Sequence, residues 1–187
     1  MRLGVFGGSF DPIHNAHLIV AGLAREQLAL DRVAFVVAAA QPLKHQGHAA
    51  TAEMRAGMAE LAIADVPGFS VDRRELNRPG PSYTVDTLRE LAAADPGAEL
   101  VLLLGADTAM GFGAWRDPAV IRSLARVAVF RRGAEVVPPG FDATVDVPAL
   151  EISSSTIRAR VRAGQPLAGW VPPRVADYIV AARIYLQ

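Results

Sequence analysis

Short apolar runs alternate with segments of helical periodicity along this chain of 187 residues. Leu3 to Phe6 is an apolar run that stops at Gly7-Gly8, and from Ala16 to Leu28 apolar residues recur at helical spacing. The next apolar run, Val33 to Ala40, ends at Gln41-Pro42. A strand, a glycine-containing loop, a helix and a second strand within about 40 residues are typical of a βαβ unit.

The same alternation continues to the end of the chain, where two helical segments follow one another. It predicts strands at Phe69–Val71, Leu100–Leu104 and Arg126–Phe130, helices at Glu53–Ala64, Tyr83–Ala94, Ser154–Arg162 and Pro173–Ala181, and loops at Asn77–Pro81 and Gly133–Asp142. This order indicates an α/β fold, a doubly wound Rossmann-like parallel sheet with helices on both faces and a C-terminal helical portion. We expect residues 1–187 to form a single domain.

In such a sheet, ligands bind beyond the carboxyl ends of the strands at the point where the strand order reverses. The loops after Phe6 and Leu104 are the candidates. Gly7-Gly8-Ser9 lacks the G-x-G-x-x-G spacing of dinucleotide-binding proteins, and no acidic residue ends the second strand, which disfavours a redox dehydrogenase. The only lysine, Lys44, follows a leucine, which excludes a P-loop ATPase.

The charge balance and the absence of cysteine exclude further classes. The 19 Lys and Arg residues match 19 Asp and Glu residues, so we expect neither a nucleic-acid nor a membrane partner. Without cysteine there is no disulfide, thiolate metal site or cysteine nucleophile. No apolar run approaches the roughly 20 residues of a membrane helix, and the N-terminus lacks a signal-peptide core, so we expect a cytoplasmic protein.

Two histidines, His14 and His17, lie three residues apart at the predicted start of the first helix. This spacing places both rings on one face, next to the free N–H groups and positive dipole end that stabilise a bound anion. Alternatively, one ring caps the helix and the other packs in the core. A metal site is a weaker interpretation, because the motif offers no third ligand. The pair together favours a phosphate-facing function.

A second motif, Ile152 to Arg158, places three serines and a threonine at the start of a later helix. One serine suffices as an N-cap, worth about 1 kcal/mol. It does not explain Arg158, because a cation in the first turn opposes the helix dipole by roughly 0.3 to 1 kcal/mol. We therefore favour phosphate binding here too.

Together the two motifs resemble those of the nucleotidylyltransferase superfamily. Three further segments, Pro81–Leu88, Leu104–Asp107 followed by Trp115, and Val171–Ile179, resemble bacterial nicotinate-nucleotide adenylyltransferases, in order and over nearly the whole length. The resemblance implies a nucleotidylyltransferase domain that transfers AMP from ATP to nicotinate mononucleotide in NAD biosynthesis. It also implies Mg²⁺ carried mainly by the ATP phosphates and no metal held by the protein.

The resemblance also implies roles for individual residues. His14, His17, Lys44 and Arg158 would be catalytic. The ATP site would comprise Gly8, Ser9, Phe10, His14, His17, Gly105, Asp107, Ser154, Ser155, Ile157 and Arg158. Lys44, Tyr83, Thr84 and Trp115 would bind nicotinate mononucleotide, with the indole stacked on the pyridine ring and backbone N–H groups reading its carboxylate. Asp107 could instead cap a helix, and Trp115 could be an ordinary packed aromatic. The neutral chain would then carry a concentrated cationic pocket.

The sequence departs from the family pattern at two places. Ala16 stands where the superfamily has glycine between the histidines, so its methyl must fit beside the nucleotide. The loop after the second strand reads Gln41 to His45 instead of Pro-Pro-His followed by a cation, and we carry over only Lys44. The alternatives are transfer to another acceptor, nicotinamide mononucleotide or phosphopantetheine, and a catalytically silent nucleotide-binding module. One sequence leaves a homo-oligomer open.

Overall fold

The computed structural model describes residues 1–39, 47–133 and 135–186. Its centre is a six-stranded sheet in the order β3-β2-β1-β4-β5-β6, and every pair of neighbouring strands is parallel. The strands are β1 (Arg2–Gly8), β2 (Arg32–Val37), β3 (Phe69–Asp72), β4 (Glu99–Gly105), β5 (Ala125–Arg132) and β6 (Ala143–Val147). The α/β prediction is confirmed.

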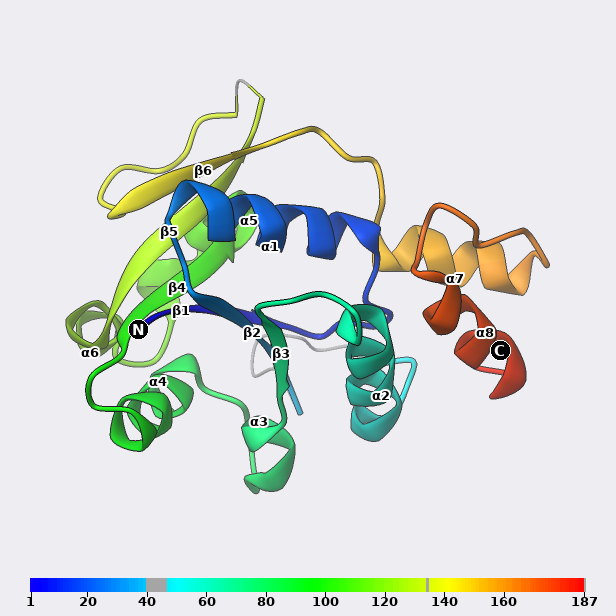
Figure 1. The fold of residues 1–187 in the computed structure, drawn as a ribbon, viewed down its shortest axis with the longest axis horizontal. Helices are drawn as coiled ribbons and strands as arrows, with labels where there is room; N and C mark the ends of the chain where they lie inside the picture. The colour runs from blue at the N-terminus through cyan, green and yellow to red at the C-terminus, as the bar shows by residue number, and fades with distance from the viewer. Residues whose placement is uncertain (40–46, 134, 187) are drawn as a thin grey trace.

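Helices lie on both faces of this sheet (Figure 1). They are α1 (Asn15–Gln27), α2 (Ala52–Ile63), α3 (Arg74–Asn77), α4 (Thr84–Ala94), α5 (Ala106–Met110), α6 (Pro118–Leu124), α7 (Ser154–Arg162) and α8 (Pro173–Ala181), with the 3-10 turn η1 (Phe112–Ala114). Helix α1 covers one face, while α4 and α6 cover the other (Figure 1). Helices α7 and α8 lie together at one end, and α8 packs against α2 (Figure 1).

Successive side chains of the central strands point to opposite faces and build two apolar layers. Leu103 of β4 belongs to the layer under α1, whereas Leu102 and Leu104 belong to the layer under α4 and α6. A strand buried on both faces reads as a continuous apolar run, which is why the sequence revealed the central strands.

Several short elements were not predicted. The sequence predicted no element at β6, α3, α5, α6 or η1. The last residue of α3, Asn77, was expected to begin a loop. The strand predicted to run to Ala40 ends at Val37, although Ala38 N still donates to the carbonyl of Gly8 at 3.0 Å. Ala40 itself lies outside the described residues. In contrast, α7 and α8 have the predicted bounds.

The strand order reverses between β1 and β4, which are neighbours although two strands separate them in sequence. The carboxyl ends of both strands lie at the same edge of the sheet, since all strands are parallel. The loops after Phe6 and Leu104 therefore meet at the switch point, as predicted. No helix within the described ranges has the length and apolar composition that crossing a membrane requires.

Candidate active site

A cavity of about 350 Å³ opens at the switch point. Its walls come from the end of β1, the first turn of α1, the end of β4 with the start of α5, the end of β5, and the segment that leads from β6 into α7. Among the residues proposed from the sequence, it brings together His14, His17, Gly105 and Ser154, and Ala16 also lines it. Segments far apart in the chain thus build one site.

The two histidines form the floor of this cavity at the start of α1. His14 is the N-cap residue and His17 lies three positions later, so the backbone amide of His14 donates a hydrogen bond to His17 Nδ1 at 3.2 Å. The two imidazoles are stacked, with centroids 3.6 Å apart. Because His17 Nδ1 accepts a hydrogen bond here, the neutral ring carries its own proton on Nε2. His14 Nδ1 is buried and has no hydrogen-bond partner among the described residues.

Burial keeps both imidazoles uncharged near neutral pH. Desolvation lowers the pKa of His14 from 6.5 to about 4, although a backbone hydrogen bond acts in the opposite direction. Burial also lowers the pKa of His17, and repulsion from His14 lowers it further. The prediction of a concentrated cationic pocket is therefore wrong for these two residues in the free protein. In the free protein, the two histidines offer the cavity oriented hydrogen-bonding groups in place of positive charge.

The loop between β1 and α1 supports the histidines from below. Phe10 is buried and adopts a positive φ of 49°, and its ring packs edge-on against the ring of His17 with centroids 5.1 Å apart. Gly8 is required here, since a Cβ at this position would lie 2.8 Å from Phe10 Cζ. Ser9 Oγ lies 3.2 Å from His48 Nε2. Gly8, Ser9 and Phe10 thus do not line the cavity but shape the loop that presents the histidines.

On the opposite side, α7 brings the serine motif to the same loop. Ser153 is the N-cap, and its Oγ accepts a hydrogen bond from Thr156 N at 3.1 Å. Ser154 Oγ donates to the carbonyl of Pro12 at 2.9 Å, and Arg158 Nη1 donates to the carbonyl of Asp11 at 2.7 Å. The motif is therefore fastened to the loop that precedes the histidines.

The other members of the predicted ATP site lie at varying distances from the cavity. Ile157 is fully buried in the apolar layer, and Ser155 is exposed on α7. Gly105 ends β4 and lines the cavity. Asp107 is exposed and does not line it, whereas its neighbour Thr108 does. Sequence reasoning missed Thr108, whose only signal was its place one residue after Asp107 in the loop that follows a buried strand.

The predicted acceptor residues gather at the start of α4 and after η1. Tyr83 is the N-cap of α4 and Thr84 its first residue, while Trp115 follows η1 and packs on Phe112 with ring centroids 5.4 Å apart. The guanidinium of Arg116 lies 4.8 Å from the centre of the Tyr83 ring. Tyr83 and Trp115 are both partly buried against the same apolar layer. Lys44 lies outside the described residues.

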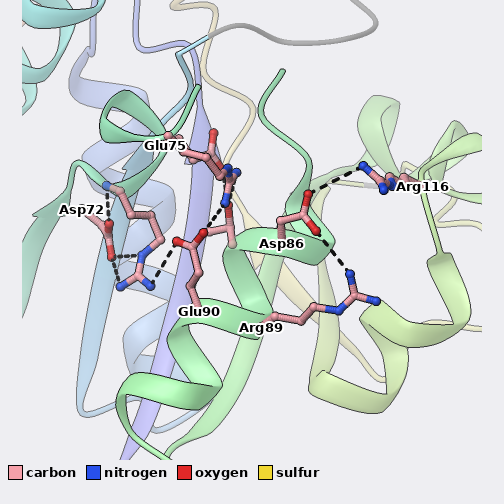
Figure 2. Close-up of polar contacts among 9 residues, drawn as sticks. Asp72, Glu75, Asp86, Arg89, Glu90 and Arg116 are labelled. Carbon is pink, nitrogen blue, oxygen red and sulfur yellow. Dashed lines mark hydrogen bonds and ion pairs between the residues drawn. The ribbon is translucent and has the colours of Figure 1, made fainter. Parts of the chain in front are cut away.

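A polar network braces this side of the molecule, and Figure 2 shows it between α3, α4 and the segment after η1. Asp86, in the first turn of α4, pairs with Arg116 at 3.8 Å and with Arg89 at 3.2 Å. Deeper in, Thr87 Oγ1 donates to buried Glu75 at 2.6 Å. Burial raises the pKa of Glu75, and hydrogen bonds from Thr87 and Ser82 oppose this change. The Asp86–Arg116 pair links the segments that carry Tyr83 and Trp115.

Comparison with known proteins decides the family of this chain. The sequence model of the family described as Cytidylyltransferase-like matches residues 5–160. A protein of Thermus thermophilus is 46% identical over 192 residues, covering 99% of this chain and 100% of its own. A protein of Corynebacterium kroppenstedtii is 45% identical over 193 residues, covering 99% of this chain and 91% of its own. Both are named "Probable nicotinate-nucleotide adenylyltransferase".

This chain belongs to the nicotinate-nucleotide adenylyltransferase family. A solved structure described as Plasmodium falciparum nicotinic acid mononucleotide adenylyltransferase complexed with NaAD shares the fold. It has a TM-score of 0.79 and 18% sequence identity, and the similarity covers 98% of this chain and 97% of that one. The family resemblance read from the sequence motifs is thereby confirmed.

Three buried polar residues next to the cavity were not predicted as site residues from the sequence. Asp11 is buried within the loop between β1 and α1, and Arg55 and Tyr185 are buried against this loop. Asp11 stood within the recognised motif, but Arg55 lay in a segment assigned only as a helix. Its signal was one arginine surrounded by alanine and methionine on that helix.

The described residues contain no cluster of three or more His, Asp or Glu side chains able to hold a metal ion. The cavity offers imidazole, hydroxyl and backbone groups and the guanidinium of Arg132, which suit phosphate oxygens better than a divalent cation.

Proposed function

We propose that this protein transfers the AMP moiety of ATP to nicotinate mononucleotide, producing deamido-NAD and pyrophosphate in a step of NAD synthesis. The observation that carries the proposal is the stacked pair His14 and His17 at the N-terminus of α1, in the switch-point cavity of a member of this family. An anion is stabilised there by free backbone N–H groups and the helix dipole.

The reaction needs no general base and no covalent enzyme intermediate. An oxygen of the acceptor phosphate, already an anion, attacks the α-phosphorus of ATP in line with the leaving group. A new P–O bond forms, and the bond from the α-phosphorus to the bridging oxygen breaks, with its electron pair departing on pyrophosphate. The protein must hold two anions together and stabilise the charge that develops on the leaving group.

His14 and His17 supply hydrogen bonds to the phosphates. The bond from His14 N to His17 Nδ1 fixes the tautomer of His17, so its Nε2–H is the donor that remains. Both rings are neutral in the free protein, and a bound phosphate would raise their pKa values because an opposite charge favours the protonated form. The pair can therefore gain positive charge when the triphosphate is present.

Ser154, which lines the cavity, and Arg158, one turn further along α7, would hold the triphosphate. Both are attached to the loop before His14 through carbonyls of Asp11 and Pro12. Lys44 is proposed as a further cation for the phosphates. Mg²⁺ would enter with ATP and neutralise the triphosphate oxygens.

The acceptor would lie against Tyr83, Thr84 and Trp115. The N-terminus of α4 presents backbone N–H groups at Thr84, which suit a carboxylate, and the indole of Trp115 offers a stacking surface for a pyridine ring. The link between Asp86 and Arg116 favours a fixed spacing between these two segments.

Pyrophosphate release with different acceptors tests the proposal. The purified protein is given MgATP with nicotinate mononucleotide, nicotinamide mononucleotide or phosphopantetheine in turn. We expect the highest kcat/KM with nicotinate mononucleotide. A higher value with either other acceptor would replace the substrate assignment, and no release with any acceptor would favour a silent nucleotide-binding module.

A further inference from the structure

Three buried polar residues lie together in and against the loop between β1 and α1. Asp11 is 4% exposed, Arg55 1% and Tyr185 6%, and they come from the loop after β1, from α2 and from the end of the chain. We call them the Asp11 cluster. None of them lines the cavity, so any role in catalysis acts through other residues.

Among the described residues, Asp11 accepts hydrogen bonds from four partners. Its carboxylate accepts hydrogen bonds from Ala49 N at 2.7 Å, from Ala50 N at 3.1 Å and from the hydroxyl of Tyr185 at 2.7 Å. Its backbone carbonyl accepts the bond from Arg158 Nη1. One residue therefore fixes the segment before α2, the C-terminal segment and the guanidinium proposed to bind triphosphate.

Arg55 fastens the same loop to the sheet. Its Nη1 donates to the carbonyls of Ser9 and Ala38, both at 2.7 Å, and its Nη2 donates to the carbonyl of Ala39 at 3.3 Å. Its Nε donates to the carbonyl of Ala50 at 3.4 Å. The planar fork of arginine suits several carbonyls at once, which the ammonium group of lysine would not match.

Tyr185 holds a backbone conformation that favours such a fixed role. Its φ is +69°, a left-handed value that is rare for an aromatic residue and persists only where the surroundings enforce it. The ring packs in the apolar layer under α1, and its hydroxyl donates to Asp11. The C-terminal segment thus ends on the loop of the active site.

We propose that Asp11, Arg55 and Tyr185 are positioning residues for nucleotidyl transfer, which hold the backbone from Ser9 to His14 and the guanidinium of Arg158 in the geometry that receives the triphosphate. This inference rests on the proposed function. Hydrogen bonds to a charged group in a buried site are strong, and losing one leaves a polar atom unpaired. The loop then relaxes, and the histidines and Arg158 no longer converge.

A comparison of two tyrosine variants tests the proposal. Tyr185→Phe keeps the ring and removes only the hydroxyl that donates to Asp11. Tyr178→Phe is the matched control, because Tyr178 also packs against the layer under α1 and makes no hydrogen bond within the described part of the chain. We expect Tyr185→Phe to lower kcat/KM for ATP about tenfold, a change of about 1.4 kcal/mol. The KM for nicotinate mononucleotide should stay within about twofold, and Tyr178→Phe should match the parent.

A merely structural role predicts a different result. Thermal unfolding is measured for both variants, and a lower Tm for Tyr185→Phe with unchanged kcat/KM for ATP would overturn the proposal. If Tyr185→Phe fails to fold, Arg55→Lys is measured in the same way. Lysine keeps the positive charge but lacks the planar guanidinium that donates to several carbonyls. A kcat/KM for ATP equal to that of the parent would likewise contradict the proposed role.

ATP binding separates this inference from the proposed function. The dissociation constant of MgATP is measured by calorimetry for the parent and both tyrosine variants. If the parent turns over no acceptor, the proposed function is wrong, yet weaker ATP binding by Tyr185→Phe alone would still support the Asp11 cluster. Equal ATP affinity in all three proteins, together with equal kcat/KM where turnover occurs, would refute it.

Discussion

The imidazole rings of His14 and His17 are stacked at 3.6 Å with 21° between their planes. The hydrogen bond from His14 N to His17 Nδ1 holds this arrangement at the first turn of α1. Two rings that share one orientation can address neighbouring oxygens of one phosphate chain. The pair is therefore the centre of the proposed mechanism.

Replacing His17 with alanine should mainly slow the chemical step. The variant loses a donor aimed at charge that develops in the transition state, so kcat should fall by about 100- to 1,000-fold. The KM for nicotinate mononucleotide should change little, because the residues proposed to bind the acceptor lie on other elements. Steady-state kinetics with each substrate varied in turn measures both quantities.

The control for this variant is Asn15→Ala, at the next residue after His14. The Asn15 side chain donates a hydrogen bond to the carbonyl of Gly169, not to either histidine. It should keep kcat near the parent value. A His17→Ala protein with normal kcat and weakened acceptor binding would contradict the assigned role.

The stability of the protein should depend on pH through His14. Its pKa is lowered from 6.5 to about 4 by burial, so between these pH values the unfolded chain binds a proton that the folded chain does not. Above pH 6.5 the ring is neutral in both states, and the free energy of unfolding has its full value. It decreases as the pH falls from 6.5 toward 4. The loss is of order 3 kcal/mol.

Urea unfolding at several pH values checks this expectation. His14→Asn keeps a residue that caps helices and removes the titrating group, so its free energy of unfolding should fall less steeply than that of the parent over the same range. Identical slopes for the two proteins would show that His14 does not carry this dependence.

Ala16 occupies a position where its methyl group lines the cavity. Ala16→Gly should destabilise the protein by up to about 1 kcal/mol, because glycine is the poorer helix former. The added space should leave the KM for ATP equal to or below the parent value. Thermal unfolding and ATP-dependent kinetics measure the two effects, and a higher KM for ATP would show that the methyl group contributes to nucleotide binding.

Trp115 should act on the acceptor alone. Removing its indole takes away the proposed stacking surface, so Trp115→Ala should raise the KM for nicotinate mononucleotide about tenfold or more while the KM for ATP stays near that of the parent. The other tryptophan provides the control. Trp170 packs under the guanidinium of Arg160 and against the other apolar layer, and its replacement should not change acceptor KM selectively. A selective loss of ATP affinity in Trp115→Ala would refute the assignment.

The sequence revealed most of the sheet because buried parallel strands are unbroken apolar runs. It also placed α7 and α8, where a serine cap and an early proline mark the starts. It missed β6, an edge strand whose buried Val145 and Val147 alternate with exposed residues over only five positions. It also missed α6, although this helix begins at Pro118 and proline is typical of a first helical turn.

For the site, sequence reasoning found the residues whose spacing is regular and missed those that meet only through folding. His14 and His17 are three positions apart, so a helix alone brings them together. Asp11 and Tyr185 are separated by 174 positions and form one hydrogen bond, which no local sequence pattern predicts. The charge of the histidines was also misjudged, because their burial follows from the layers above and below them.

We propose that this protein joins AMP to nicotinate mononucleotide with the help of the histidine pair. The most direct measurement is the chromatographic yield of deamido-NAD from MgATP and nicotinate mononucleotide, compared with pyrophosphate released in the same reaction. We predict equimolar deamido-NAD and pyrophosphate from the parent protein, at a rate reduced about 100-fold or more in His17→Ala. Absence of deamido-NAD with the parent, or an unchanged rate in the variant, would contradict the account.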